Sequence, residues 1–133
     1  MNKRKFVSGL QKALAEDDRI VFAYLHGSFL DGDKFNDVDI ALYLDENEFL
    51  KIVAADFEIA LSLRVEKSLG LPVDVKILNH APLSFRYHAT RGYLLFCRND
   101  STWEEFLCRT WGEYFDFKPV SDIYLKEIFF ASI

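Results

Sequence analysis

The chain has 133 residues, which fits one domain of ordinary size. Its 16 basic and 21 acidic residues give a formal net charge of −5, which argues against a protein that follows the backbone of long DNA or RNA, because each phosphate contact needs a Lys or Arg. The two cysteines are too few for a disulfide scaffold, and the longest apolar runs are too short to span a membrane. We therefore expect a cytoplasmic protein.

Aromatic residues make up 16% of the chain, with 13 Phe, 6 Tyr and 2 Trp. A small domain can place these rings in a core built from Phe rather than Leu. Alternatively, some of them form an exposed surface that binds a protein partner. Composition leaves both explanations open.

The first half of the chain predicts one helix and two strands. Apolar residues recur at helical spacing over residues 6–14, which indicates an amphipathic helix. Residues 20–25 form a short, fully apolar run typical of a buried strand. Glycines, aspartates and an asparagine fill residues 27–36, which favours a loop, and residues 37–44 predict a second strand.

The middle of the chain predicts a long helix and a third strand. Residues 46–69 carry apolar side chains at steps of three and four and end at Gly70, so we expect one continuous helix. Residues 73–78 alternate apolar and charged side chains, which is the period of a strand with one buried face.

The last part of the chain predicts a short helix over residues 82–92 and a fourth strand over residues 93–97. Ser101 to Glu104 match a capping box, which predicts a helix that continues until Pro119, and residues 121–130 predict a last helix. The expected fold class is α/β or α+β: a small mixed sheet flanked by helices. We expect one domain over residues 1–133, with a core over about 1–98 and a helical C-terminal extension over about 100–133.

Three aspartates are predicted to meet on one surface of this sheet. Asp37 and Asp39 are two residues apart on a strand, so their side chains project from the same face, whereas Val38 and Ile40 face the core. On the third strand Asp74 is out of phase with its apolar neighbours. If the two strands are adjacent, the three carboxylates converge.

Three close carboxylates repel one another unless a hard cation such as Mg²⁺ neutralises them. Two such ions can support an in-line phosphoryl displacement. Gly27 and Ser28 follow the first predicted strand, where a Gly-Ser turn can direct backbone amides and a small hydroxyl at phosphate oxygens. The pattern indicates a metal-dependent phosphoryl-transfer site, although each part alone also occurs in ordinary strand ends and turns.

These residues resemble the minimal nucleotidyltransferases (MNT) of the DNA polymerase beta-like nucleotidyltransferase superfamily. The motif is His26-Gly27-Ser28, eight residues, then Asp37-Val38-Asp39-Ile40. The spacer is two residues shorter than the ten that are usual in the family, although Gly32 keeps its place four residues after Ser28. This shortening puts the nucleotide preference in doubt more than the class of reaction.

Later segments resemble successive blocks of MNT antitoxins, including residues 71–78, 81–83, 91–96 and 114–119. The resemblance implies a polymerase beta-like nucleotidyltransferase fold and an antitoxin that transfers AMP from ATP to a tyrosine of a HEPN-family RNase toxin. It also implies that Gly27 and Ser28 hold the triphosphate and that Asp37, Asp39 and Asp74 are the catalytic, metal-binding residues. Asp74 would also activate the acceptor hydroxyl, so Mg²⁺ and ATP are the expected cofactor and substrate.

Two alternatives to this function stay open. The chain could be an antitoxin that acts by binding alone, which its aromatic C-terminal half would support. It could also transfer a nucleotide to a small molecule. Whether the chain modifies a toxin or only binds it, we expect the partner to dock on Trp103, Phe106, Trp111, Tyr114, Phe115 and Phe129-Phe130.

Overall fold

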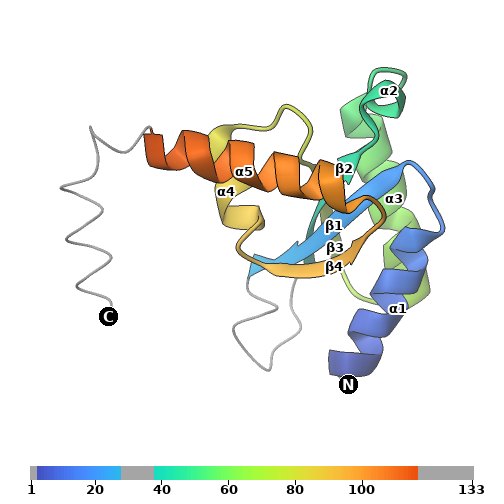
Figure 1. Ribbon diagram of the computed structural model, residues 1–133. Helices are drawn as coiled ribbons and strands as arrows, with labels where there is room; N and C mark the ends of the chain where they lie inside the picture. Colours follow the sequence, from blue (N-terminus) through green and yellow to red (C-terminus); the bar gives the residue numbers. More distant parts are fainter. Residues whose placement is uncertain (1–2, 28–37, 117–133) are drawn as a thin grey trace.

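A four-stranded mixed sheet covered by helices on both faces forms the centre of the protein (Figure 1). The computed structural model describes residues 3–27 and 38–116. Its elements, in chain order, are α1 (Lys3–Ala15), β1 (Ile20–His26), β2 (Val38–Leu44), α2 (Glu46–Phe49), α3 (Ala54–Leu69), β3 (Val73–Ile77), α4 (Leu83–Ala89), β4 (Tyr93–Cys97) and α5 (Asp100–Asp116). The predicted α+β class is confirmed.

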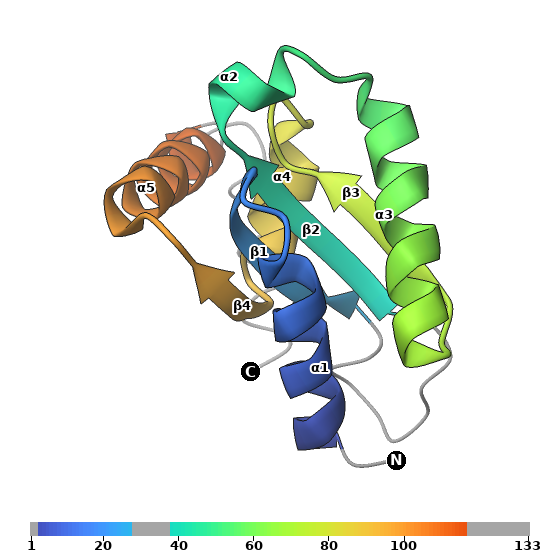
Figure 2. The same ribbon diagram turned by 90° about the vertical axis from the view of Figure 1, so that its right-hand side faces the viewer.

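The strand order is β3-β2-β1-β4. β1 pairs antiparallel with both β2 and β4, and β2 pairs parallel with β3. Figure 2 shows α1 and α3 on one side of the sheet and α4 and α5 on the other. Because both faces are covered, four consecutive residues of β1, from Phe22 to Leu25, are buried.

Each face of the sheet has its own apolar core. The face toward α1 and α3 is aliphatic and includes Leu10, Leu25, Ile40, Leu42, Leu61 and Val75. The face toward α4 and α5 is aromatic: Phe22 stacks on Tyr43 with ring centroids 5.0 Å apart, and Phe106 packs against both rings. A large part of the aromatic content therefore builds this second core.

The predicted helix over residues 46–69 is wrong as a single helix. Asp45 caps the short helix α2 by accepting from the backbone N–H groups of Asn47 and Glu48, and Val53 is extended, with φ −94° and ψ 115°. The break lets α2 turn across the end of the sheet and places Phe49 and Ile52 against the aliphatic core.

The start of the C-terminal helix also differs from the prediction. α5 begins at Asp100, and the Asn99 side chain accepts from the Thr102 backbone N–H at 3.1 Å. Asn99, rather than Ser101, therefore supplies the cap, because Asn99 directly precedes the helix whereas Ser101 is already its second residue. The helix predicted over residues 121–130 lies outside the described residues.

The aromatic residues expected to bind a partner take different places. Phe106 is 2% exposed and belongs to the core, which corrects its assignment to a docking surface. Trp111 donates from Nε1 to Thr90 Oγ1 at 3.0 Å, and Tyr114 stacks on Tyr87 at 3.7 Å. Phe115 is 45% exposed, and Phe129-Phe130 lie outside the described residues.

Within residues 3–27 and 38–116, no helix is both long enough and apolar enough to cross a lipid bilayer.

Candidate active site

Three polar residues form a row across the sheet at the end where β1 finishes and β2 and β3 begin. His26 of β1 is the register partner of Asp39 of β2, and Asp39 is the register partner of Asp74 of β3. Register partners project from the same face, and adjacent strands are about 4.8 Å apart. The two aspartates are therefore neighbours, because β2 and β3 are adjacent, which was the condition for the predicted convergence.

The phase of the apolar residues fixes the face on which these carboxylates lie. Val38 and Ile40 are buried in the aliphatic core below α1 and α3, and Val73 and Val75 are buried beside them. The intervening Asp39 and Asp74 consequently project from the other face, toward the side of α4 and α5. Asp74 is exposed, and Asp39 is partly buried.

Gly27 follows β1 directly and lies against the Asp39 carboxylate. Its φ of +82° is in the left-handed region that favours glycine. A Cβ atom at this position would overlap Oδ2 of Asp39. Two independent reasons therefore favour glycine at position 27: its backbone conformation and the close approach of the predicted catalytic side chain of Asp39.

A pocket of about 290 Å³ opens in front of the two aspartates and is lined by Asp39, Asp74, Glu66, Pro72 and Val73. Glu66, on α3, accepts from the Val73 backbone N–H at 2.9 Å. This hydrogen bond fixes the start of the strand that carries Asp74. The sequence alone did not identify Glu66, because only the packing of α3 beside β3 brings the two together.

His26 is enclosed between the carboxylates and α4. Its ring meets that of Phe85 edge-on at 5.7 Å, and its buried Nε2 has no hydrogen-bond partner among the described residues. Burial lowers the pKa of His26, and the negative charges of Asp39 and Asp74 oppose that shift. The imidazole is therefore neutral at neutral pH and is not an ion-pair partner of the carboxylates.

The strand geometry excludes an alternative motif. Arg19 and His26 have the spacing of an RNase motif of HEPN toxins, which lies on a helix. Here Arg19 lies in the turn before β1 and His26 is the last residue of that strand, and Arg19 pairs with Asp17 at 2.7 Å. The match is a coincidence of spacing.

Of the predicted site residues, the structure describes Gly27, Asp39 and Asp74 and brings all three together. Asp37 and Ser28 lie outside the described residues. Among the residues that are described, no group of three or more His, Cys, Asp or Glu side chains could hold a metal ion.

The two described carboxylates nevertheless fit a magnesium site in their chemistry. Asp39 and Asp74 offer only oxygen donors, which Mg²⁺ prefers, and they face a common pocket. Mg²⁺ is commonly held by one or two carboxylates, water and substrate phosphates. The chemistry of the pair therefore fits part of a magnesium site, with Asp37 as the predicted third ligand.

Comparison with known proteins agrees with this arrangement. The family model "Polymerase beta, Nucleotidyltransferase" matches residues 9–101. That range includes β1, β2 and β3 and thus both described carboxylates. No curated protein matches the chain.

Several solved structures share the fold. A chain of the tri-AMPylated Shewanella oneidensis HEPN toxin in complex with MNT antitoxin superposes with a TM-score of 0.70 and 16% identity, over 96% of this chain and 99% of that one. A toxin–antitoxin structure with AMP-PNP gives a TM-score of 0.71 and 16% identity, over 92% and 98% of the two chains. The MntA–HepT toxin–antitoxin structure superposes with a TM-score of 0.68 and 16% identity, over 95% of this chain and 98% of that one.

At these identities the superpositions establish the fold, and the family model spans most of the chain. The Gly27 turn and the paired aspartates lie within the range that the family model matches, and the chain belongs to the polymerase beta nucleotidyltransferase family.

Proposed function

We propose that this protein transfers AMP from ATP to a tyrosine hydroxyl of a HEPN-family RNase toxin and thereby acts as its antitoxin. The observation that carries the proposal is the in-register pair of Asp39 and Asp74 beside the Gly27 turn. Carboxylates next to a phosphate-binding turn are what nucleotidyl transfer requires.

In the proposed reaction the acceptor oxygen attacks the α-phosphorus of ATP. A new oxygen–phosphorus bond forms, the bond to the β-phosphate bridging oxygen breaks, and pyrophosphate leaves. Asp74, the more exposed of the two carboxylates, takes the proton of the hydroxyl. Gly27 and Ser28 hold the triphosphate, since glycine allows the closest backbone approach.

Asp37, Asp39 and Asp74 are the proposed ligands of Mg²⁺, in a two-metal site. Magnesium, when bound there, supplies positive charge that offsets the charge of the triphosphate and of the leaving pyrophosphate. Asp39 and Asp74 come from two strands of one sheet, so their separation is set by strand spacing rather than by loop conformation.

The proposed partner follows from the comparisons. Chains that share this fold occur in complexes with HEPN toxins, one of which carries three AMP groups, and one structure contains AMP-PNP. We propose that the chain works as one nucleotidyltransferase domain in the cytoplasm, with α5 as part of that domain, because Phe106 anchors α5 on the sheet.

The test is transfer of radiolabelled AMP from α-labelled ATP to a co-purified HEPN toxin in the presence of Mg²⁺. Wild type should label the toxin, and both Asp39→Asn and Asp74→Asn should lower labelling by at least about 100-fold, because each removes a charged ligand. Asp56→Asn, on the exposed first turn of α3, is the matched control and should label normally.

The same experiment separates the alternatives. If wild type binds the toxin without labelling it, and Asp39→Asn still rescues growth from the toxin, the protein acts by binding alone. If AMP instead appears on a small molecule in a cell extract while the toxin stays unlabelled, the proposed acceptor is wrong.

A further inference from the structure

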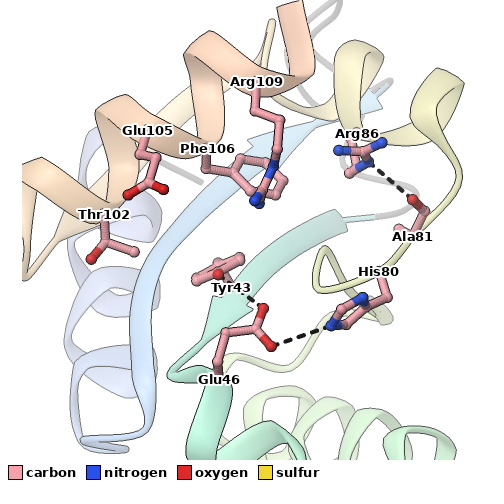
Figure 3. A pocket seen from close by; sticks show the side chains of 9 residues that line it. All are labelled: Tyr43, Glu46, His80, Ala81, Arg86, Thr102, Glu105, Phe106 and Arg109. Carbon is pink, nitrogen blue, oxygen red and sulfur yellow. Dashed lines mark hydrogen bonds and ion pairs between the residues drawn. The ribbon is translucent and has the colours of Figure 1, made fainter. Parts of the chain in front are cut away.

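A second and larger pocket, of about 630 Å³, lies away from the paired aspartates (Figure 3). Its floor includes Tyr43, four residues beyond Asp39 on β2, which corresponds to about 13 Å along the strand. Helices α4 and α5, the start of α2 and the turn after β3 enclose it. Neither Asp39 nor Asp74 lines this pocket, so it is separate from the candidate active site.

One wall of the pocket is held rigidly. The buried Asn79 side chain accepts from the Leu44 backbone N–H and donates to the Leu44 carbonyl, each at 2.8 Å. The next residue, His80, has a φ of +60°, which is uncommon for a residue other than glycine. Its ring stacks on Phe49 at 5.4 Å. The turn is therefore fixed in place before any ligand binds, and such strained positions concentrate at functional sites.

The Glu46 carboxylate is already satisfied by the protein. Oε1 accepts from Tyr43 Oη at 3.0 Å and from Asn79 Nδ2 at 3.1 Å, and Oε2 lies 3.2 Å from His80 Nε2. Burial and the hydrogen bond to Glu46 raise the pKa of Tyr43 to about 12, so Tyr43 stays protonated as the donor. Glu46 thus closes one end of the pocket and holds His80 there.

The arginines of the pocket are not equally occupied. Arg86 is largely buried and donates to the Ala81 carbonyl at 3.0 Å and to Glu113 at 3.2 Å. Arg109 follows Glu105 by four residues on α5, a spacing that favours an ion pair. Among the described residues Glu105 and Arg109 form no ion pair; the Arg109 guanidinium lies over the Phe106 ring, 5.9 Å from its centre, is close enough to Tyr43 to interact with its hydroxyl, and points into the pocket.

We propose that this pocket binds a small phosphate monoester that carries several hydroxyl groups, such as a nucleoside monophosphate or a sugar phosphate. The fork of Arg109 faces the open space and suits a phosphate oxygen pair. Glu105 lies one turn before Arg109 on α5 and Thr102 lies two turns before it, and both are placed to accept from ligand hydroxyls. The volume lies within the range of small-molecule sites.

The charge of the lining predicts selectivity. Two arginines, Arg86 and Arg109, and two glutamates, Glu46 and Glu105, line the pocket, so its formal charges balance and do not offset the larger negative charge of a triphosphate. We therefore expect AMP and ribose 5-phosphate to bind this pocket more tightly than ATP does, which is the reverse of what a nucleotidyltransferase active site requires.

The test is isothermal titration calorimetry of the full chain with AMP, ribose 5-phosphate, ATP and inorganic phosphate. Arg109→Gln should weaken AMP binding by at least about tenfold, since a charge-assisted bidentate contact is lost. Arg91→Gln is the matched control, because Arg91 contacts Tyr87 outside the pocket. Asp39→Asn should retain AMP binding, which places the AMP site apart from the candidate active site.

Several results would overturn the inference. One is the absence of AMP binding to wild type at millimolar concentrations, and another is equal AMP affinity of wild type and Arg109→Gln. Loss of AMP binding in Asp39→Asn would assign that binding to the active site. Glu105→Gln should weaken AMP binding, because an acceptor for the ligand hydroxyls changes, but should not weaken binding of inorganic phosphate, because a negative charge is removed; weaker binding of both would refute the role of the ligand hydroxyls. Urea unfolding checks that each variant is folded.

Discussion

Gly27 and Gly70 share a left-handed backbone conformation, with φ of +82° and +75°, but differ in their surroundings. A Cβ atom on Gly27 would overlap the Asp39 carboxylate, whereas one on Gly70 would meet nothing within 4 Å. The pair therefore separates the cost of backbone strain from the cost of displacing a site residue.

Gly27→Ala should lose about 1–2 kcal/mol of unfolding free energy from backbone strain and should also lose most AMP transfer, because Asp39 must move. Gly70→Ala should lose a similar free energy and keep its transfer activity. Urea unfolding and the labelling assay measure the two effects. Normal transfer by Gly27→Ala would show that the Asp39 position is not critical.

At the scale of single residues, the sequence predicted correctly the face of the sheet from which Asp39 and Asp74 project. Strand alternation alone placed Asp39 and Asp74 on the face opposite the buried valines, and their register confirms it. Glu66 could not be predicted, because its contact with Val73 depends on how far along β3 helix α3 lies. No periodicity within a helix encodes that offset.

Among the elements, β3 is an edge strand that pairs with β2 on one side and is held by side chains of α3 on its outer side. Two glutamates of α3 accept from its outward amides: Glu66 from Val73 at 2.9 Å and Glu58 from Ile77 at 2.8 Å. This satisfies amides that an edge otherwise leaves open to other chains. It also ties the position of Asp74 to α3.

Glu66→Ala and Glu58→Ala should each cost about 1–2 kcal/mol of unfolding free energy, because each leaves one strand amide without its partner. Only Glu66→Ala should also lower AMP transfer strongly, since Glu66 holds the end of β3 next to Asp74. Glu66→Gln keeps an acceptor oxygen and should restore much of the activity. Equal activities of the two alanine variants would refute a positioning role for Glu66.

The pairing of α4 with α5 changes the expectation for Trp111. The sequence suggested that a substitution there would weaken complex formation more than folding. In the structure Trp111 donates to Thr90 and its ring lies 4.9 Å from that of Tyr87. Trp111 thus connects the two helices.

Trp111→Ala should therefore lower the unfolding free energy by about 2 kcal/mol or more, whereas Trp111→Phe should lose only the hydrogen bond, about 1 kcal/mol. Thermal and urea unfolding of the purified chain measure both. If Trp111→Ala is as stable as wild type, the contacts of Trp111 with α4 do not stabilise the fold, and the expectation that Trp111 binds a partner is retained.

For the whole molecule, part of the net charge of −5 is concentrated where Asp39 and Asp74 face one pocket. Repulsion between them opposes folding, and a bound cation would remove that penalty. Stability should therefore depend on divalent metal.

Mg²⁺ should raise the thermal midpoint of wild type, and EDTA should reverse the rise and abolish AMP transfer. Asp39→Asn should show a smaller rise, because one ligand is lost, whereas Asp56→Asn should respond like wild type. Differential scanning calorimetry at several Mg²⁺ concentrations measures this. The same rise in wild type and Asp39→Asn would place the metal elsewhere.

The sequence by itself determined the α+β class, the strands and the face on which Asp39 and Asp74 lie, because strand periodicity and turn residues are local properties. Only the tertiary structure decided that residues 46–69 form two helices, since the break at Val53 accompanies the packing of Phe49 and Ile52 against the aliphatic core. It also decided that Phe106 belongs to the core, that the partly buried Trp111 connects α5 to α4, and that Arg109 faces a second pocket. Those outcomes depend on which surfaces meet when the helices pack on the sheet, and local sequence patterns do not specify that contact.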